Sequence, residues 1–146
     1  MPMPNFLIVG AAKSGTTSLY HYLAQHPQVF MAANKEPHHF APAKWCGHPP
    51  LDRIAYEHLF QGAEGMKAVG EASTGYLYYP ESPEWIHSAI PDCRIVIILR
   101  NPVERAFSGY CHEVREGVET VSFEAALAEE RVGLRIIRGG EFSFNY

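Results

Sequence analysis

Unbroken apolar runs mark the strands that the sequence predicts. The clearest runs are residues 5–9 (NFLIV) and 94–99 (RIVIIL), and residues 28–31 and 67–73 are two shorter candidates. Strands of a parallel sheet are covered on both faces and are apolar throughout, whereas a strand with one face in water alternates apolar and polar residues. We therefore expect residues 5–9 and 94–99 to be buried strands of a parallel sheet.

Helices are expected between these strands, where apolar residues recur at helical spacing. The predicted helices cover residues 15–25, 51–60, 82–90, 101–117 and 122–131. A polar capping residue begins three of them, and in two cases a proline follows at the first helical position. These start signals are Ser82-Pro83, Asn101-Pro102 and Ser122. Strands that alternate with helices indicate a three-layer α/β fold, in which a mainly parallel sheet is flanked by helices and ligands bind at the carboxyl ends of the strands.

The turn between the first strand and the first helix reads GAAKSGTTS, residues 10–18. It resembles the phosphate-binding loop of nucleotide triphosphatases, G-x-x-x-x-G-K-[ST], but Thr16 stands where that lysine would be and Lys13 lies inside the loop. Backbone N–H groups of residues 12–17, at the start of a helix, would form a nest for an anion. An ordinary glycine turn would explain the glycines but not the whole Lys-Ser-Gly-Thr-Thr-Ser run.

The position of the lysine bears on the kind of group that is bound. Triphosphatases place their lysine beside Mg²⁺ to neutralise the transferring phosphoryl group, whereas a sulfuryl group carries less charge and can move with a lysine and backbone donors alone. Arg100 follows the strand at 94–99 directly, where a triphosphatase would have a metal-binding aspartate. We therefore expect an anion site without a metal ion.

A second cluster of polar residues follows the strand at 94–99. Arg100 comes directly after it, and Arg105 and Ser108 are three residues apart, hence on one face of the next helix. Because arginine binds phosphate oxygens through two parallel hydrogen bonds, the cluster suits a second phosphate. The alternative is a solvated ion pair with Glu104 or Glu113, which is the favoured interpretation for Arg105 alone and the weaker one for Arg100.

Two motifs in these segments resemble those of sulfotransferases that use 3′-phosphoadenosine 5′-phosphosulfate (PAPS). Residues 6–19, FLIVGAAKSGTTSL, resemble the 5′-phosphosulfate loop, and residues 99–110, LRNPVERAFSGY, are similar to the 3′-phosphate motif, in family order and about 85 residues apart. The resemblance implies a P-loop type fold, PAPS as donor and 3′-phosphoadenosine 5′-phosphate (PAP) as product. It assigns the 5′-phosphosulfate to Lys13, Ser14, Gly15, Thr16, Thr17 and Ser18, and the 3′-phosphate to Arg100 and Ser108.

A long loop is predicted over residues 32–50, and its NKEPHHF segment resembles the K-E-x-H-F-F segment of the glycosaminoglycan N- and 3-O-sulfotransferases and their bacterial relatives. The resemblance implies that Glu36 is the general base toward the acceptor. His38 and His39 are further candidates, because histidine accepts protons at neutral pH, although packing would explain at least one of them. Lys13 would stabilise charge on the leaving phosphate.

A third segment, GEASTGYL at residues 70–77, resembles the G-E-K-[ST]-P-x-Y segment that lines the acceptor site in this branch. Ala72 stands where the family has lysine. The sequence therefore lacks one cationic contact to an acceptor, which disfavours a strongly anionic polysaccharide.

Composition narrows the partners and the setting. With 146 residues, 47% of them hydrophobic, the chain is expected to form one domain over residues 1–146, about half the usual family length and so truncated. The net charge of −4 argues against nucleic acid, and three cysteines and eight histidines show no metal-ligand spacing. The N-terminus resembles neither a signal peptide nor a membrane span, so we expect a cytoplasmic protein.

These observations predict an enzyme that moves a sulfuryl group from PAPS to a hydroxyl or amine of a carbohydrate, lipid or other small acceptor. Two alternatives stay open at this point. One is a P-loop nucleotide kinase or triphosphatase, and the other is a nucleotide-binding fragment without turnover. The sequence assigns no oligomeric state.

Overall fold

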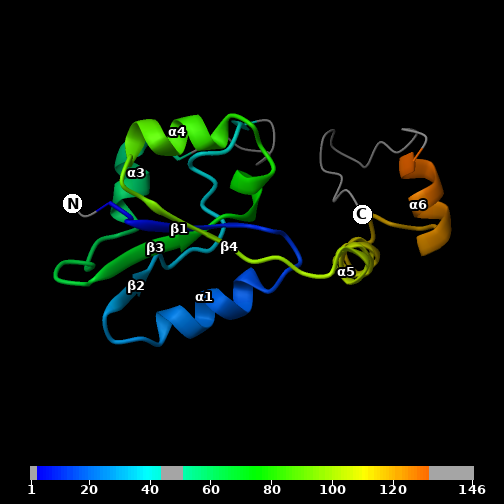
Figure 1. Cartoon of the computed structure of the whole chain (residues 1–146), viewed down its shortest axis with the longest axis horizontal. Helices are drawn as coiled ribbons and strands as arrows, with labels where there is room; N and C mark the ends of the chain where they lie inside the picture. The colour runs from blue at the N-terminus through cyan, green and yellow to red at the C-terminus, as the bar shows by residue number, and fades with distance from the viewer. Residues whose placement is uncertain (1–2, 44–50, 132–146) are drawn as a thin grey trace. The chain divides into compact units, whose positions relative to one another are not determined.

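The computed structural model describes residues 3–43 and 51–131, and the chain divides between Leu99 and Arg100 into two compact units. The first unit contains a sheet and the helices that pack on it (Figure 1). Its elements are β1 (Phe6–Gly10), α1 (Thr16–Ala24), β2 (Val29–Met31), α3 (Arg53–His58), β3 (Ala68–Ala72), the 3₁₀ helix η1 (Thr74–Leu77), α4 (Ser82–Ala89) and β4 (Arg94–Ile97).

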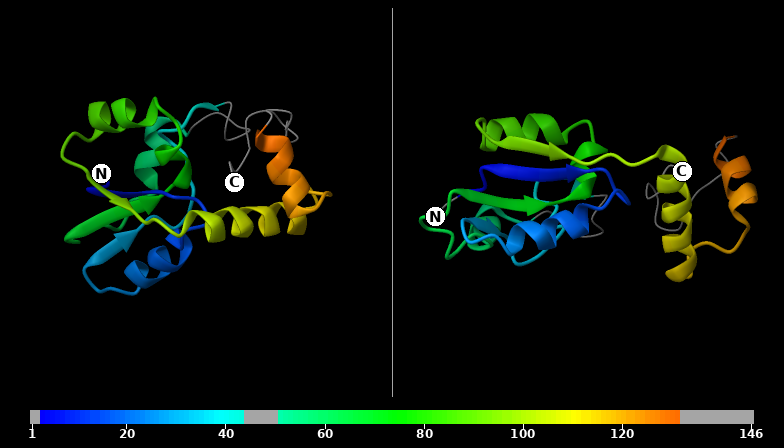
Figure 2. Two further views of the ribbon diagram at one scale, coloured as in Figure 1. Left: turned by 45° about the vertical axis from the view of Figure 1, so that its right-hand side comes forward. Right: turned by 60° about the horizontal axis from the view of Figure 1, so that its bottom comes forward.

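The four strands form one parallel sheet in the order β2-β3-β1-β4. Helix α1 covers one face, and α3 and α4 cover the other, as the views in Figures 1 and 2 both show. The predicted three-layer architecture with a parallel sheet is therefore confirmed. Because β1 lies inside the sheet next to β3, the loops that follow these two strands leave the same edge.

Strand β1 supplies side chains to two hydrophobic clusters, one on each face of the sheet. Leu7 and Ile8 have no exposed surface, and since successive side chains point to opposite faces they belong to different clusters. Leu7 packs with Tyr56 and other side chains from α3 and α4, whereas Ile8 packs with Tyr20 of α1. The prediction that this run is a buried strand is confirmed.

Strand β4 differs from its prediction. We expected a buried strand over residues 94–99, but β4 ends at Ile97, and Ile95 and Ile97 are 48% and 49% exposed. The reason is topological: β4 is an edge strand that pairs only with β1, and the described residues do not cover these isoleucines. Arg100 therefore follows the strand by three residues instead of directly.

The start of α4 also differs from its prediction. Glu81 is the N-cap, and Ser82 is the first helical residue. The Ser82 hydroxyl is fully buried and donates to the carbonyl oxygen of Phe40 at 2.7 Å. A tertiary hydrogen bond thus replaces the expected cap, and it fixes the segment around Phe40 on α4.

The second unit contains α5 (Pro102–Arg115) and α6 (Phe123–Arg131). Asn101 caps α5 as predicted, because its side-chain oxygen accepts from the backbone N–H groups of Val103 and Glu104. The Ser122 hydroxyl likewise accepts from an amide in the first turn of α6. No helix among residues 3–43 and 51–131 is both long enough and apolar enough to cross a membrane.

Candidate active site

The loop between β1 and α1 has the backbone of an anion site. Gly15 is the N-cap of α1 with φ 97°, a left-handed conformation that glycine adopts without strain, and Lys13 is also left-handed at φ 62°. No side chain caps α1. The first N–H groups of a helix have no partner within the helix, so those of α1 and the positive end of its dipole suit an anion.

A serine hydroxyl in this loop supports the fit to a sulfate- or phosphate-like group. Ser14 Oγ is buried and has no hydrogen-bond partner among the described residues. A buried polar atom without a partner is costly, and in native structures such atoms commonly bind a ligand or water. Ser14 thus fits the predicted 5′-phosphosulfate site, as does Thr16, which is buried in the first turn of α1. The described residues contain no cluster of three or more metal-ligating side chains.

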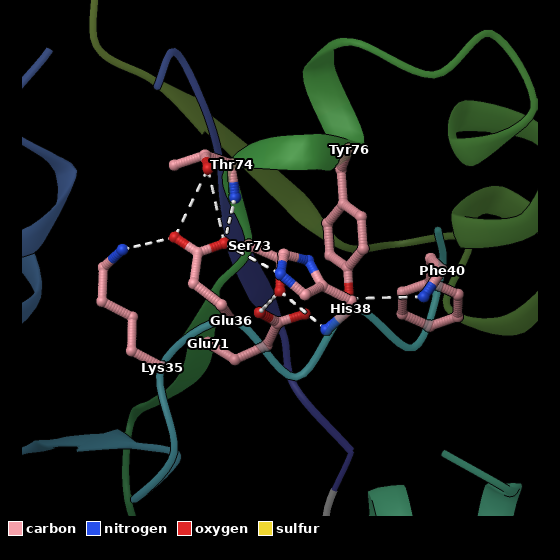
Figure 3. Close-up of polar contacts among 8 residues, drawn as sticks. All are labelled: Lys35, Glu36, His38, Phe40, Glu71, Ser73, Thr74 and Tyr76. Carbon is pink, nitrogen blue, oxygen red and sulfur yellow. Dashed lines mark hydrogen bonds and ion pairs between the residues drawn. The ribbon is translucent and has the colours of Figure 1, made fainter. Parts of the chain in front are cut away.

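The segment that carries Glu36 is docked on the carboxyl end of β3 (Figure 3). The Glu36 N–H donates to the Ala72 carbonyl oxygen at 2.8 Å, and the His38 N–H donates to Ser73 Oγ at 3.1 Å. Both Glu36 and His38 have left-handed backbone, with φ of 61° and 53°. Such conformations cost about 1–3 kcal/mol each and persist where surrounding contacts hold them, often at functional sites.

The Glu36 carboxylate is oriented by three neighbours, all visible in Figure 3. The Thr74 N–H donates to Glu36 Oε2 at 2.8 Å, and Lys35 Nζ pairs with Oε1. His38 Nε2 lies 3.6 Å from Oε2. The Glu36 side chain remains 28% exposed, so a substrate can still reach it. This combination of fixed orientation and access suits a proton acceptor.

Thr74 connects this carboxylate with the anion loop. Its N–H binds Glu36, while its carbonyl oxygen lies only 3.3 Å from the position that a Cβ on Gly10 would occupy. Gly10 is the last residue of β1 and begins the loop toward Lys13. The predicted base and the predicted donor loop therefore meet at one edge of the sheet, within a single unit.

The two histidines of the segment differ in environment. His38 lies beside Glu36, as described above, and its side chain is 15% exposed. His39 Nδ1 lies 2.7 Å from the Leu51 carbonyl oxygen, and its ring stacks on Tyr56 at a centroid distance of 4.1 Å. Burial lowers the pKa of His39. Its contacts match the packing interpretation that the sequence left open, whereas His38 stays a candidate.

Glu71 of β3 is the residue that sequence reasoning missed. It is fully buried, and its carboxylate accepts from Ser73 Oγ at 2.9 Å and from the Tyr56 hydroxyl at 3.3 Å. Burial raises the pKa of Glu71 to about 7, although hydrogen bonds from Tyr76 and Ser73 act in the opposite direction. The sequence did contain a signal for this residue, because Glu71 is the one charged residue in the otherwise uncharged strand AVGEA.

Arg100 and Ser108 belong to the second unit, and their convergence with the donor loop on one ligand stays a prediction. Arg100 Nε lies 3.2 Å from Glu104 Oε2, the ion pair that the sequence left as the alternative. The pair is exposed, with 40% and 62% of the two side chains accessible, and exposed pairs contribute at most about 1 kcal/mol. A phosphate could therefore displace Glu104 at low cost.

The whole described region matches a known family. Residues 3–132 match the family model described as the sulfotransferase domain. The chain belongs to the sulfotransferase family. A crystal structure of a sulfotransferase from Alicyclobacillus acidocaldarius superposes with a TM-score of 0.83 and 44% sequence identity, over 90% of this chain and 58% of that one.

Two curated relatives of this sulfotransferase-family chain also match. Heparan sulfate glucosamine 3-O-sulfotransferase 6 of Homo sapiens is 32% identical over 130 residues, which are 89% of this chain and 36% of that protein. Membrane-associated sulfotransferase kil1 of Dictyostelium discoideum is 32% identical over 109 residues, 74% of this chain and 22% of that protein. The chain thus spans about a fifth to a third of the length of these relatives.

Proposed function

We propose that this sulfotransferase-family chain takes part in transfer of a sulfuryl group from PAPS to a hydroxyl or amine of a carbohydrate or other small acceptor, with PAP as the second product. The observation that carries the proposal is the meeting of two features at one sheet edge. These are an anion loop with a buried serine hydroxyl that lacks a partner, and an oriented, accessible carboxylate, joined through Thr74.

Three residues would have direct roles in the reaction. Glu36 takes the proton from the acceptor as the acceptor oxygen or nitrogen forms its bond to sulfur. Lys13 stabilises the negative charge on the 5′-phosphate as the bond between sulfur and the bridging oxygen breaks. Ser14 donates its hydroxyl hydrogen to the same group, which satisfies the buried oxygen. The donor supplies the sulfuryl group, and no protein side chain is modified.

The relatives and one difference in sequence support a choice of acceptor class. Matched proteins include a heparan sulfate glucosamine 3-O-sulfotransferase and carbohydrate sulfotransferase 15, so a sugar hydroxyl is the first acceptor to test. Ala72 provides no cation where the related segment has lysine. We therefore expect preference for a neutral or weakly anionic sugar over a highly sulfated polysaccharide.

Calorimetry tests the donor first. PAP should bind in the presence of a metal chelator, and it should bind more tightly than ATP with Mg²⁺. Binding that strictly requires Mg²⁺, or that favours ATP, would contradict the proposal and favour the kinase or triphosphatase alternative.

Single-turnover sulfuryl transfer tests the base. The acceptor is chosen from a panel of glucosamine-containing oligosaccharides and simple alcohols. Glu36→Gln should retain PAP affinity and lose about 10² to 10⁴ in rate, because the amide accepts no proton. Glu57→Gln on α3, which neutralises the surface partner of Arg53, is the matched control. An unchanged rate in Glu36→Gln rejects Glu36 as base, and a larger loss in His38→Ala transfers that role to His38.

A further inference from the structure

A carboxyl group, that of Glu71, is buried inside the central sheet, and its hydrogen-bond partners among residues 3–43 and 51–131 are hydroxyl groups. Glu71 has no exposed surface, and the rest of its strand consists of alanine, valine and glycine. A buried carboxylate is unfavourable unless hydrogen bonds replace its hydration. These hydroxyl groups come from three different segments, and two of them also accept hydrogen bonds from backbone N–H groups.

The first hydroxyl group, that of Ser73, connects Glu71 with the backbone of His38. Ser73 Oγ donates to Glu71 Oε2 at 2.9 Å, and the same oxygen accepts the His38 N–H at 3.1 Å. Because Ser73 Oγ donates its one hydrogen to the carboxylate, its lone pairs are left for the amide, and Figure 3 shows both contacts. His38 is one of the two left-handed residues of the loop, which need such support.

A second hydroxyl group, that of Tyr76, connects Glu71 with the backbone of Phe40. The Phe40 N–H donates to the Tyr76 hydroxyl oxygen at 3.3 Å, and the Tyr76 side chain is hydrogen-bonded to Glu71. The His38 and Phe40 N–H groups thus donate to two hydroxyl groups, and both hydroxyl groups are hydrogen-bonded to the Glu71 carboxylate. The Glu36 amide, held by the Ala72 carbonyl oxygen, is the third attachment.

We propose that Glu71 is a positioning residue, which holds residues 36–40 through Ser73 and Tyr76 and so aims the Glu36 carboxylate. The part of this inference that concerns the reaction rests on the proposed function. Glu71 itself is fully buried, so its role is to hold other residues and not to contact the substrate. Its carboxylate form accepts hydrogen bonds and donates none, so it imposes one direction on the hydroxyl groups around it.

Ionisation of Glu71 therefore changes the network. Burial raises the pKa of Glu71 to about 7, and the protonated form can donate a hydrogen bond of its own, which allows the hydroxyl groups to reorient. Groups that influence this titration come from four segments around Glu71. They are Glu36 of the loop, Tyr56 of α3, Ser73 and Tyr76 around η1, and Cys93 before β4. We expect the loop to be held most firmly above pH 7.

Amide hydrogen exchange, followed by NMR on the full chain, tests the positioning role without an activity assay. Glu71→Gln should lower protection of the His38 and Phe40 amides about fivefold to tenfold at pH 8, because one weakened hydrogen bond changes a local equilibrium by that order. The Ala32 amide, bonded to the Gly70 carbonyl oxygen, is the internal reference and should not change.

A second variant and a double variant keep the test decisive if one substitution damages folding. Ser73→Ala should lower protection at His38 more than at Phe40, because Ser73 accepts the His38 N–H directly and reaches Phe40 only through its hydrogen bond with Tyr76. Combined with Glu71→Gln it should add little at His38, because both changes act through one path. Glu113→Gln, at the buried glutamate of α5, is the control for neutralising a buried carboxyl and should leave both amides unchanged. Unchanged exchange at His38 and Phe40, or equal loss at Ala32, overturns the proposal.

Transfer kinetics separate this inference from the proposed function. Glu71→Gln should retain PAP affinity, lower the single-turnover rate about tenfold, and remove a rise in rate between about pH 6 and 8. An unchanged rate and pH profile overturn the aiming of Glu36 by Glu71. If the wild-type chain transfers no sulfuryl group while the exchange results hold, the proposed function fails and the loop-positioning role stands.

Discussion

Replacing Glu71 by glutamine should change how the stability of the protein depends on pH. The folded-state pKa of Glu71 is about 7, above the value of 4.5 in the unfolded chain. Between these two values the folded protein binds more protons than the unfolded chain, so the free energy of unfolding falls as pH rises. This effect is absent below about pH 4.5, develops up to about pH 7, and is constant above it. Glutamine does not titrate, so Glu71→Gln lacks it.

The size of the effect follows from the burial of the carboxyl group. Each unit of pKa difference corresponds to about 1.4 kcal/mol, so a pKa that rises from 4.5 to about 7 predicts a loss of roughly 3 kcal/mol in the wild type. Small domains are stable by only about 5–15 kcal/mol. The loss is therefore large enough to measure. At acidic pH the free energy of unfolding of Glu71→Gln should be lower than that of the wild type. By pH 8 this difference in unfolding free energy should become smaller or change sign.

Urea unfolding followed by far-UV circular dichroism, at intervals from pH 4 to pH 8, provides the measurement. The quantity of interest is the difference in unfolding free energy between wild type and Glu71→Gln. Tyr56→Phe is the matched control, because it retains the titrating carboxyl but removes a hydrogen bond that lowers the pKa of Glu71, and so should extend the fall in stability to higher pH. A difference between wild type and Glu71→Gln that is independent of pH would refute the reasoning.

Three further predictions concern the sheet and the donor site. Gly70→Ala should destabilise the protein by about 1–3 kcal/mol in urea unfolding, because the new Cβ would lie 2.3 Å from the Phe6 ring; a neutral result would show that Phe6 can move. Lys13→Ala should slow single-turnover transfer from PAPS more than it weakens PAP binding, and the reverse pattern would make Lys13 only a binding residue. Arg100→Ala should weaken calorimetric binding of PAP far more than that of adenosine 5′-phosphate, whereas equal losses would indicate that Arg100 does not contact the 3′-phosphate.

Features that depend on neighbouring residues in the chain were predictable from sequence. The strand β1, the glycine-rich turn and the Asn101 cap each have a signature within a few residues of sequence, and each was found where expected. The resemblance of residues 34–40 to a known segment also led to Glu36, whose carboxylate is oriented and accessible in the structure.

Features that depend on distant partners were not predictable in this way. The apolar run of β4 suggested burial, but exposure is decided by which elements lie beside it, and β4 is an edge strand. Ser82 had the local signature of a cap, yet its hydroxyl bonds to Phe40, 42 residues earlier in the chain. Glu71 acquires its environment from hydroxyl groups on α3, η1 and the turn between β3 and η1, which no local pattern brings together.

The contact between Gly10 and η1 affects how mutational scans of this protein should be interpreted. A side chain at position 10 would place its Cβ 2.8 Å from Leu77 Cβ and would crowd the Thr74 carbonyl oxygen. The N–H group of the same Thr74 donates to the Glu36 carboxylate. Intolerance of substitution at Gly10 would ordinarily be attributed to lost nucleotide contact. Here the same phenotype would arise from displacement of Thr74, which orients the carboxylate of Glu36, the proposed proton acceptor. Donor affinity and acceptor turnover must therefore be scored separately before sensitivity at position 10 is assigned to either substrate.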